Sequence, residues 1–154
     1  MRSTELVETM KEFLASIEAE YTFKEDAFRC DTTINDKLKN VCFIIHVYKN
    51  GYTISAIPED VTIDETKTTD VSEYINMVNV ETSGSHMSVY DDIVMCSCVL
   101  NCRGMVPNIK QIRECFVAII SCLEDFGGGL LDVIAGKGTP REIFKKYMEE
   151  DRDV

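Results

Sequence analysis

The sequence predicts an α+β fold in which helices pack on one face of an antiparallel sheet of about five strands. Three observations support this prediction. An Asn-Gly pair joins two strand-like runs, amphipathic helical patterns occur at both ends of the chain, and successive strand-like runs are joined by short turns. The expected order is α-β-β-β-α-β-β-α-α, in one domain over residues 1–154 with an ordered core of about 4–149.

The segment 41–57 is the centre of the predicted sheet. Its Asn50-Gly51 pair fits a two-residue type I′ turn, because both positions of that turn need a positive φ. Such a turn places Lys49 opposite Tyr52, and in the same register Val47 lies opposite Ile54. Side chains alternate between the faces of a strand, so one face would be apolar and carry Phe43, Ile45, Val47, Ile54 and Ala56. The other face would be mixed and carry Cys42, Ile44, His46, Tyr48, Thr53, Ser55 and Ile57.

The N-terminal part of the chain predicts one helix and one strand. The helix would be capped by Ser3 or Thr4 and run to about Tyr21. The strand would cover residues 27–34 and end at the turn residues Asn35-Asp36. The apolar side of the helix would consist of Leu6, Met10, Phe13, Leu14, Ile17 and Tyr21.

The segment after the central hairpin is acidic, and residues 59–69 are expected to form a loop. Asp70 and Glu73 then fit a capping box for a short helix over residues 71–79. Ser83-Gly84 should break the helix after this segment. The inward side of the short helix would consist of Val71, Tyr74, Ile75 and Val78.

A second hairpin is expected over residues 85–101. Asp91-Asp92 is its turn, although aspartate adopts the left-handed conformation less readily than glycine does. With this turn, one face of the hairpin would carry Met87, Val89, Val94, Cys96, Cys98 and Leu100.

Two long helical patterns follow. Pro107 precedes a helix over about residues 108–126, and the three glycines at 127–129 should stop it. A separate short helical turn is expected over residues 130–135. The last helix begins with Thr139-Pro140-Arg141-Glu142, which supplies an N-cap, a proline at the first helical position and a glutamate for a capping box.

The charge of the chain limits its partners. Sixteen basic and 27 acidic residues give a net charge of −11, which repels nucleic-acid phosphates and anionic lipids. We therefore expect neither nucleic-acid nor membrane binding. The first residues lack the apolar stretch of a signal peptide, and no apolar run approaches transmembrane length, so a cytoplasmic protein is expected.

The seven cysteines are expected to be reduced thiols that serve as small core residues. Cys96, Cys98 and Cys102 form a C-x-C-x-x-x-C pattern, whereas zinc modules use C-x-x-C pairs on turns. The segment Gly136–Thr139 departs from a phosphate-binding loop because Gly138 separates Lys137 from the threonine. We therefore expect no metal site, no cofactor and no catalytic residue.

The order of elements resembles a known family. The start helix, the F-x-I-x-V run before Asn50-Gly51, the helix with the sequence YINMVN at residues 74–79 and the later hairpin and Ile-rich helix are similar to the YbjN-like family. That family is described as proposed bacterial sensory-transduction regulators with a fold like that of type III secretion chaperones. The resemblance implies a regulatory or chaperone-like protein, and it implies a homodimer, since chaperones of this fold are typically homodimers.

Two functional hypotheses follow. The first is a non-enzymatic protein-binding module whose predicted partner surface includes Tyr74, Met77 and Val80, with the acidic loop as a polar rim that attracts a basic partner. The second is a small-ligand binder or enzyme that uses the mixed sheet face near His46, Tyr48 and Ser55. A deep pocket at these residues would favour the second hypothesis, and a flat apolar surface would favour the first.

Overall fold

The computed structural model describes residues 2–152, with side chains described from residue 4 to residue 150. Within this range the chain forms four α-helices, one 3₁₀ helix and a six-stranded sheet. In chain order, the elements are α1 (Arg2–Ser16), β1 (Thr22–Lys24), β2 (Ala27–Thr32), β3 (Val41–Tyr48), β4 (Gly51–Pro58), η1 (Glu65–Lys67), α2 (Thr68–Glu81), β5 (His86–Tyr90), β6 (Ile93–Asn101), α3 (Ile109–Ile134) and α4 (Pro140–Arg152).

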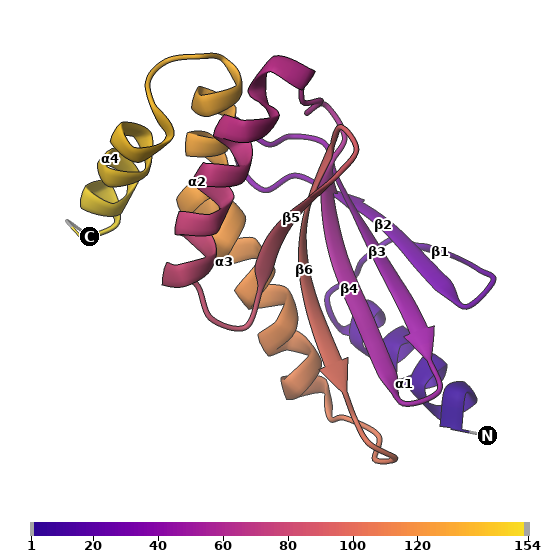
Figure 1. The fold of residues 1–154 in the computed structure, drawn as a ribbon. Helices are drawn as coiled ribbons and strands as arrows, with labels where there is room; N and C mark the ends of the chain where they lie inside the picture. The colour runs from indigo at the N-terminus through magenta and orange to yellow at the C-terminus, as the bar shows by residue number, and fades with distance from the viewer. Residues whose placement is uncertain (1, 153–154) are drawn as a thin grey trace.

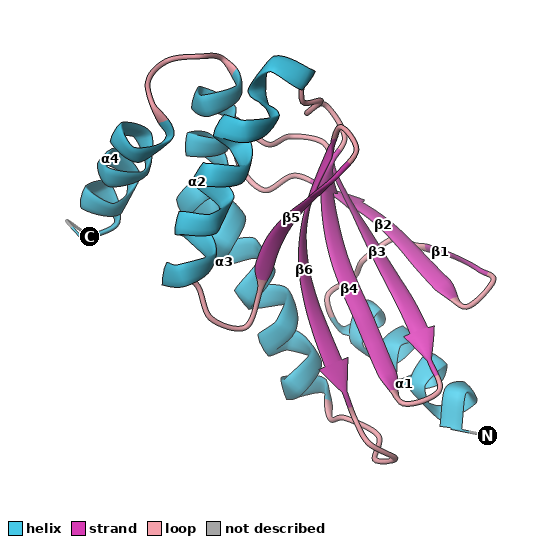
Figure 2. Ribbon diagram, viewed as in Figure 1, coloured by secondary structure: helices cyan, strands magenta, loops and turns pink. Residues whose placement is uncertain are grey.

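The strands pair antiparallel in the order β1-β2-β3-β4-β6-β5. In Figure 1, α1 and α3 lie behind the sheet, α2 lies beside β5, and α4 is farthest from the strands. Figure 2 shows the same arrangement by element type, with the opposite face of the sheet uncovered by helices. The predicted α+β class, with helices on one face of an antiparallel sheet, is therefore confirmed.

The sixth strand, β1, comes from a region that the sequence assigns to the end of the first helix and the segment after it. Helix α1 ends at Ser16, and Glu18 adopts a left-handed conformation with a φ of 55°. Ile17 and Tyr21 consequently lie outside the helix and are exposed. The turn between β1 and β2 uses Glu25 and Asp26, which have φ values of 54° and 58°. The pair lacks the glycine or asparagine that marks a two-residue hairpin turn most strongly, and this hairpin was not predicted.

The central hairpin turns one residue earlier than the sequence predicts. Tyr48 pairs with Gly51, so the turn consists of Lys49 and Asn50, and neither of these has a positive φ. A Cβ atom on Gly51 would overlap the carbonyl oxygen of Leu100 on β6, so the neighbouring strand requires this glycine. The predicted pairing is wrong by two residues. An even shift leaves every side chain on its predicted face.

The predicted apolar face of the hairpin is buried under α1 and α3. The ring of Phe43 stacks on Phe116 of α3 at a centroid distance of 5.3 Å, and Phe116 lies 5.0 Å from Phe13 of α1. The hydroxyl of Tyr52 donates a hydrogen bond to the carbonyl oxygen of Leu6 in α1. All five predicted residues of this face are buried: Phe43, Ile45, Val47, Ile54 and Ala56.

Helix α2 begins earlier than predicted. Asp64 caps the short helix η1 by accepting a hydrogen bond of 2.9 Å from the backbone N–H of Thr66, and α2 follows directly at Thr68. Asp70 therefore lies inside α2, and the predicted capping box with Glu73 is wrong. The preceding segment is also more ordered than a simple loop, because the side chains of its two aliphatic residues are buried: Val61 and Ile63.

The second hairpin has the predicted register. Tyr90 pairs with Ile93, so Asp91 and Asp92 form the turn, and Asp91 adopts a φ of 54°. The predicted apolar face points toward the core, and its buried members are Met87, Val94, Cys96 and Cys98. Val89 and Leu100, at the ends of this face, are partly buried against the same core.

The three glycines lie inside α3, and the predicted stop at this point is wrong. The helix continues to Ile134 and ends before Gly136, which has a φ of 71°. A Cβ atom on Gly129 would overlap the hydroxyl oxygen of Tyr74, which donates a hydrogen bond of 2.7 Å to the carbonyl oxygen of Phe126. The glycines therefore allow side chains from neighbouring segments to approach the backbone of α3.

Helix α4 packs on α2 and α3 from the side remote from the sheet. Its start confirms the predicted capping box, since the N–H of Glu142 donates to Thr139 Oγ1 at 3.2 Å and the N–H of Thr139 donates to Glu142 Oε2 at 3.4 Å. The hydroxyl of Tyr147 lies close to the backbone at Gly128 and donates to Asp132 at 2.9 Å.

Replacing Gly129 with alanine should lower the free energy of unfolding by about 1–3 kcal/mol, because the new methyl group displaces Tyr74 from its buried position. Alanine alone would raise helix stability by about 1 kcal/mol, so the expected sign opposes the helix propensity. Urea denaturation measures the change. Gly127→Ala is the matched control and should cost less, because its methyl group meets only the end of the Leu38 side chain. A stabilised Gly129→Ala variant would contradict the packing described here.

Candidate functional site

One face of the sheet is not covered by any helix within residues 2–152. We define the open face as the residues of β3, β4, β5 and β6 that point away from α1 and α3. The register places on it Cys42, Ile44, His46, Tyr48, Gly51, Thr53, Ser55, Ile57, His86, Ser88, Tyr90, Ile93, Met95, Ser97, Val99 and Asn101. None of these residues is Asp, Glu, Lys or Arg, although the chain has 16 basic and 27 acidic residues. On the same side of the sheet, the neighbouring strand β2 carries Arg29 beside Ile44 and Asp31 beside Cys42, so charged residues border the open face there.

Large apolar side chains on the open face are exposed. Tyr90 is 70% exposed, Val99 is 63% exposed and Tyr48 is 54% exposed, and Ile93 is also exposed. These residues come from three different strands, so they are distributed across the face. Single exposed apolar residues are common on protein surfaces, whereas a group on one uncharged face is typical of an interaction surface.

The open face is shallow. The hollow near Tyr48 and Val99 has a volume of about 130 Å³ and lies over the ends of β3, β4 and β6. Pockets for small ligands are usually about 300–1,000 Å³, so this hollow is too small to enclose one. The sequence hypotheses distinguished a deep pocket from a flat apolar surface, and the open face agrees better with the flat surface.

The residues of the ligand-binding hypothesis do not form one site. The rings of His46 and Tyr48 are 6.2 Å apart, which places them side by side along β3. Ser55 makes its hydrogen bond with Ser97 on the neighbouring strand, at an Oγ–Oγ distance of 2.9 Å. The partner of the Ser55 hydroxyl is thus another hydroxyl and not a histidine, so the arrangement lacks the serine–base contact that activates a nucleophile.

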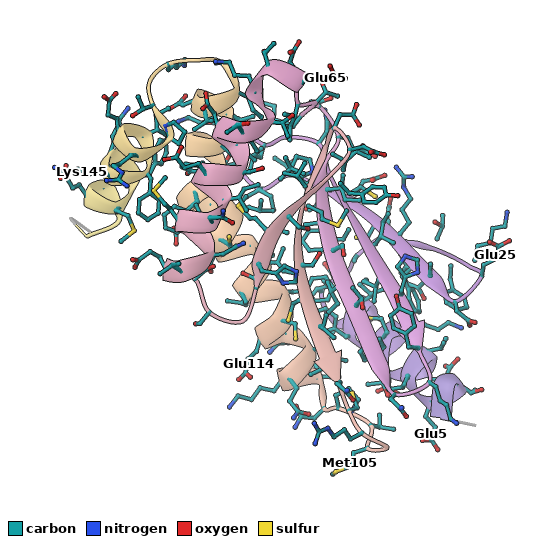
Figure 3. All side chains as sticks on the ribbon, in the orientation of Figure 1. Glu5, Glu25, Glu65, Met105, Glu114 and Lys145 are labelled. Atoms are coloured by element: carbon teal, nitrogen blue, oxygen red, sulfur yellow. The ribbon has the colours of Figure 1, made fainter. Side chains whose placement is uncertain are left out.

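One end of the sheet is acidic. We define the acidic end as the exposed residues Asp31, Glu59, Asp60, Asp91 and Asp92. The N–H of Ile63 donates to the carbonyl oxygen of Asp92 at 3.1 Å, which holds the segment after β4 against the turn between β5 and β6. Glu65, labelled in Figure 3, lies at the same end of the molecule. The acidic end thus borders the uncharged open face.

Three residues at the acidic end have the composition of a metal site. Asp31, Cys42 and Glu59 each bring one ligand atom to within 4.8 Å of the others. Arg29, however, donates to Glu59 at 2.6 Å and lies 3.8 Å from Asp31. Burial raises the pKa of Cys42 to about 11, so its sulfur is protonated and is a weak ligand at neutral pH. The guanidinium therefore already supplies positive charge to these carboxylates.

The three residues of the predicted partner surface on α2 differ in their exposure to solvent. Tyr74 is fully buried and packs edge-on against Phe144 of α4 at 6.4 Å, so it does not belong to a surface. Met77 is half-buried, and Val80 is 82% exposed at the end of α2. The predicted role of Met77 and Val80 in partner binding remains a prediction.

Both edges of the sheet are poorly suited to accepting another strand. At one edge, Asn79 of α2 donates to the carbonyl oxygen of Met87 at 2.9 Å and accepts from its N–H at 2.8 Å. The amide thus occupies the outward hydrogen-bonding groups of β5 at this position. At the other edge, β1 is only 3 residues long. The face of the sheet is therefore a better candidate interaction surface than its edges.

Comparison with known proteins shows a relationship at the level of the fold. No protein-family model matches the sequence, and no curated protein matches it. A solved structure, YbjN from E. coli, aligns with a TM-score of 0.58 at 11% sequence identity, over 79% of this chain and 91% of that one. This chain has a YbjN-like fold. YbjN is described as a proposed transcription regulator. The predicted resemblance is thereby confirmed at the level of the fold.

In the residues that the structure describes, no helix is both long enough and apolar enough to cross a membrane. The mixed face expected for the central hairpin forms part of the open face, whereas its extension by Tyr90 on β5 and Val99 on β6 was not predicted. A signal was present, since the segment 86–101 contains only two charged residues, both at its turn.

The purified protein should contain no stoichiometric zinc, because Arg29 pairs with the carboxylates that a cation would need and the thiol of Cys42 is protonated. Elemental analysis after purification without chelators measures this. One equivalent of zinc that disappears in a Cys42→Ser variant would contradict the prediction.

Proposed function

We propose that the chain is a non-catalytic protein-binding module of a regulatory or chaperone-like kind, and that it binds its partner on the open face of the sheet. The observation that carries this proposal is an exposed apolar surface without charged residues on a chain of net charge −11. Removing a charge from water is costly, so the centres of interfaces are depleted in charged residues and enriched in aromatic ones. The open face has both properties.

The acidic end indicates the chemistry of the partner. A matching partner segment would have two parts. Its apolar side chains would lie over Tyr48 and Val99 of the open face, and its Lys or Arg residues would lie near Glu59 and Asp92 of the acidic end. The negative charge would also increase the rate of association with a basic partner, and salt would reduce this effect. The acidic loop of residues 59–65, which was expected to attract a basic partner, lies beside the sheet and would contribute to this attraction.

The similarity to YbjN supports a regulatory role, since that protein is described as a proposed transcription regulator. A regulator with the charge of this chain would act through a protein partner. The hollow on the open face is small, and the hydroxyl of Ser55 is hydrogen-bonded to Ser97 rather than to a histidine, so the enzyme or ligand-binding alternative is the weaker hypothesis.

Replacing Val99 with lysine should abolish binding of the wild-type partners, because the partner would have to bury an unpaired charge on the open face. Pull-down from the native host with quantitative mass spectrometry identifies the wild-type partners, and sedimentation detects self-association. Val99 is exposed, so the melting temperature should change little.

Two matched variants complete this experiment. Val117→Lys adds the same charge at an exposed position of α3, outside the sheet, and should retain all partners. Met77→Lys tests the surface on α2 that was predicted from the sequence. Loss of partners in Met77→Lys together with their retention in Val99→Lys would move the binding surface to α2. A wild-type chain that binds no protein and stays monomeric would refute the module itself.

The chain should not bind DNA or RNA at physiological salt, because its net charge of −11 repels phosphates. Gel retardation with duplex DNA and single-stranded RNA at micromolar protein tests this expectation. Retardation that weakens steeply with added salt would show a phosphate-binding surface and would contradict the prediction.

A further inference from the structure

Two pairs of cysteines face each other between β6 and α3. Cys96 and Cys98 are two residues apart on β6, which places them on the same side of the strand. Cys115 and Cys122 are seven residues apart on α3, which places them on the same side of the helix. Strand β6 packs against α3, and the thiols face each other in two pairs, Cys98 with Cys115 and Cys96 with Cys122, each pair close enough for one thiol to shift the pKa of the other.

The two pairs differ in their access to solvent. Cys98 and Cys115, which we call the outer pair, are each 8% exposed. Cys96 and Cys122, which we call the inner pair, are 0% and 2% exposed. A reagent from solution can therefore reach the outer pair with a much smaller opening of the structure than the inner pair needs.

We propose that the outer pair is a redox-active dithiol that closes to a disulfide when a small disulfide such as oxidised glutathione is available. The Cys98 thiolate attacks one sulfur of the small disulfide, forms a mixed disulfide and releases one small thiolate, which takes up a proton. Cys115 then loses its proton to solvent, and its sulfur attacks Cys98 Sγ and releases the second small thiol. Two protein thiols are oxidised, and one small disulfide is reduced to two thiols.

Cys98 is the attacking sulfur for a physical reason. The thiol of Cys115 donates its hydrogen bond to Cys98, which stabilises the Cys98 thiolate and lowers the pKa of that group. Burial raises the pKa of the more exposed cysteines, Cys30 and Cys102, and of Cys42 at the acidic end. The resolving thiol is thus already in contact with the thiol that reacts first.

The disulfide would join β6 to α3 across the loop at residues 102–108. Met105, at the tip of this loop in Figure 3, is exposed. Closing the segment from Cys98 to Cys115 restricts this loop in the unfolded chain, so oxidation should raise the melting temperature. Excess small thiol would return the pair to its reduced form, in agreement with the reduced thiols that the sequence predicts.

The experiment uses the full chain and oxidised glutathione under native conditions. Peptide mapping of the wild-type protein should show a Cys98–Cys115 disulfide, with the inner pair still reduced. In Cys115→Ser the resolving sulfur is missing, so a mixed disulfide with glutathione should accumulate on Cys98. That adduct should form about tenfold faster than adducts on Cys30 or Cys102, because the thiolate is the reactive form.

Cys30→Ser and Cys102→Ser are the controls and should leave the Cys98–Cys115 disulfide unchanged. Melting temperatures of the reduced variants, measured first, show whether each one folds. Two results would overturn the proposal: initial glutathione adducts on Cys30 or Cys102 in the wild-type protein, or a wild-type chain whose outer pair stays reduced while other thiols react.

Discussion

The fold depends on burying one face of the central hairpin under two helices that are far apart in the sequence. Phe43 stacks on Phe116 of α3, and Phe116 in turn contacts Phe13 of α1, so one aromatic group joins the start of the chain, the sheet and the longest helix. Helices α2 and α4 then extend this layer sideways. They pack on α3, where the glycines at 127–129 admit Tyr74 and Tyr147 close to its backbone. Among the described helices, none remains to cover the other face of the sheet.

The elements that the sequence predicts well are those in which local signals and burial agree. The start of α4 has the capping box that Thr139 and Glu142 favour locally. The second hairpin also has its predicted turn, because aspartate tolerates the left-handed conformation that Asp91 adopts and the apolar faces of both strands agree with that register. The central hairpin shows how a wrong turn can still give correct faces. The Asn50-Gly51 pair suggested a type I′ turn, but the glycine is needed against Leu100, a residue that lies far away in sequence. Side chains alternate between the two faces of a strand, so a pairing that is shifted by two residues still leaves each side chain on the same face.

The glycines of α3 show the opposite case. A run of three glycines in an isolated helix is unfavourable, and local reasoning therefore ends the helix there. The structure offsets this cost by the packing of Tyr74 and Tyr147, which local patterns do not reveal. The same tertiary contact accounts for the burial of Tyr74, in agreement with its predicted place on the inward side of α2. Its hydroxyl has a partner in the carbonyl group of Phe126, and α4 closes over it. The open face, in contrast, could be predicted in part. Its residues on the central hairpin follow from the alternation of side chains between the two faces of each strand.

Strand β6 connects the two inferences about function, because alternate residues of one strand serve opposite faces. Val99 belongs to the open face, while Cys98 points toward α3 and Cys115. A disulfide on the core side would leave the chemistry of the open face unchanged and would reduce the freedom of the strand that carries Val99. Association with a partner costs less when the binding surface is already held in one conformation. Oxidation of the outer pair would therefore act on partner binding through the rigidity of β6, and its effect would be larger for a partner centred on Val99 than for one bound at Val80, which lies on α2.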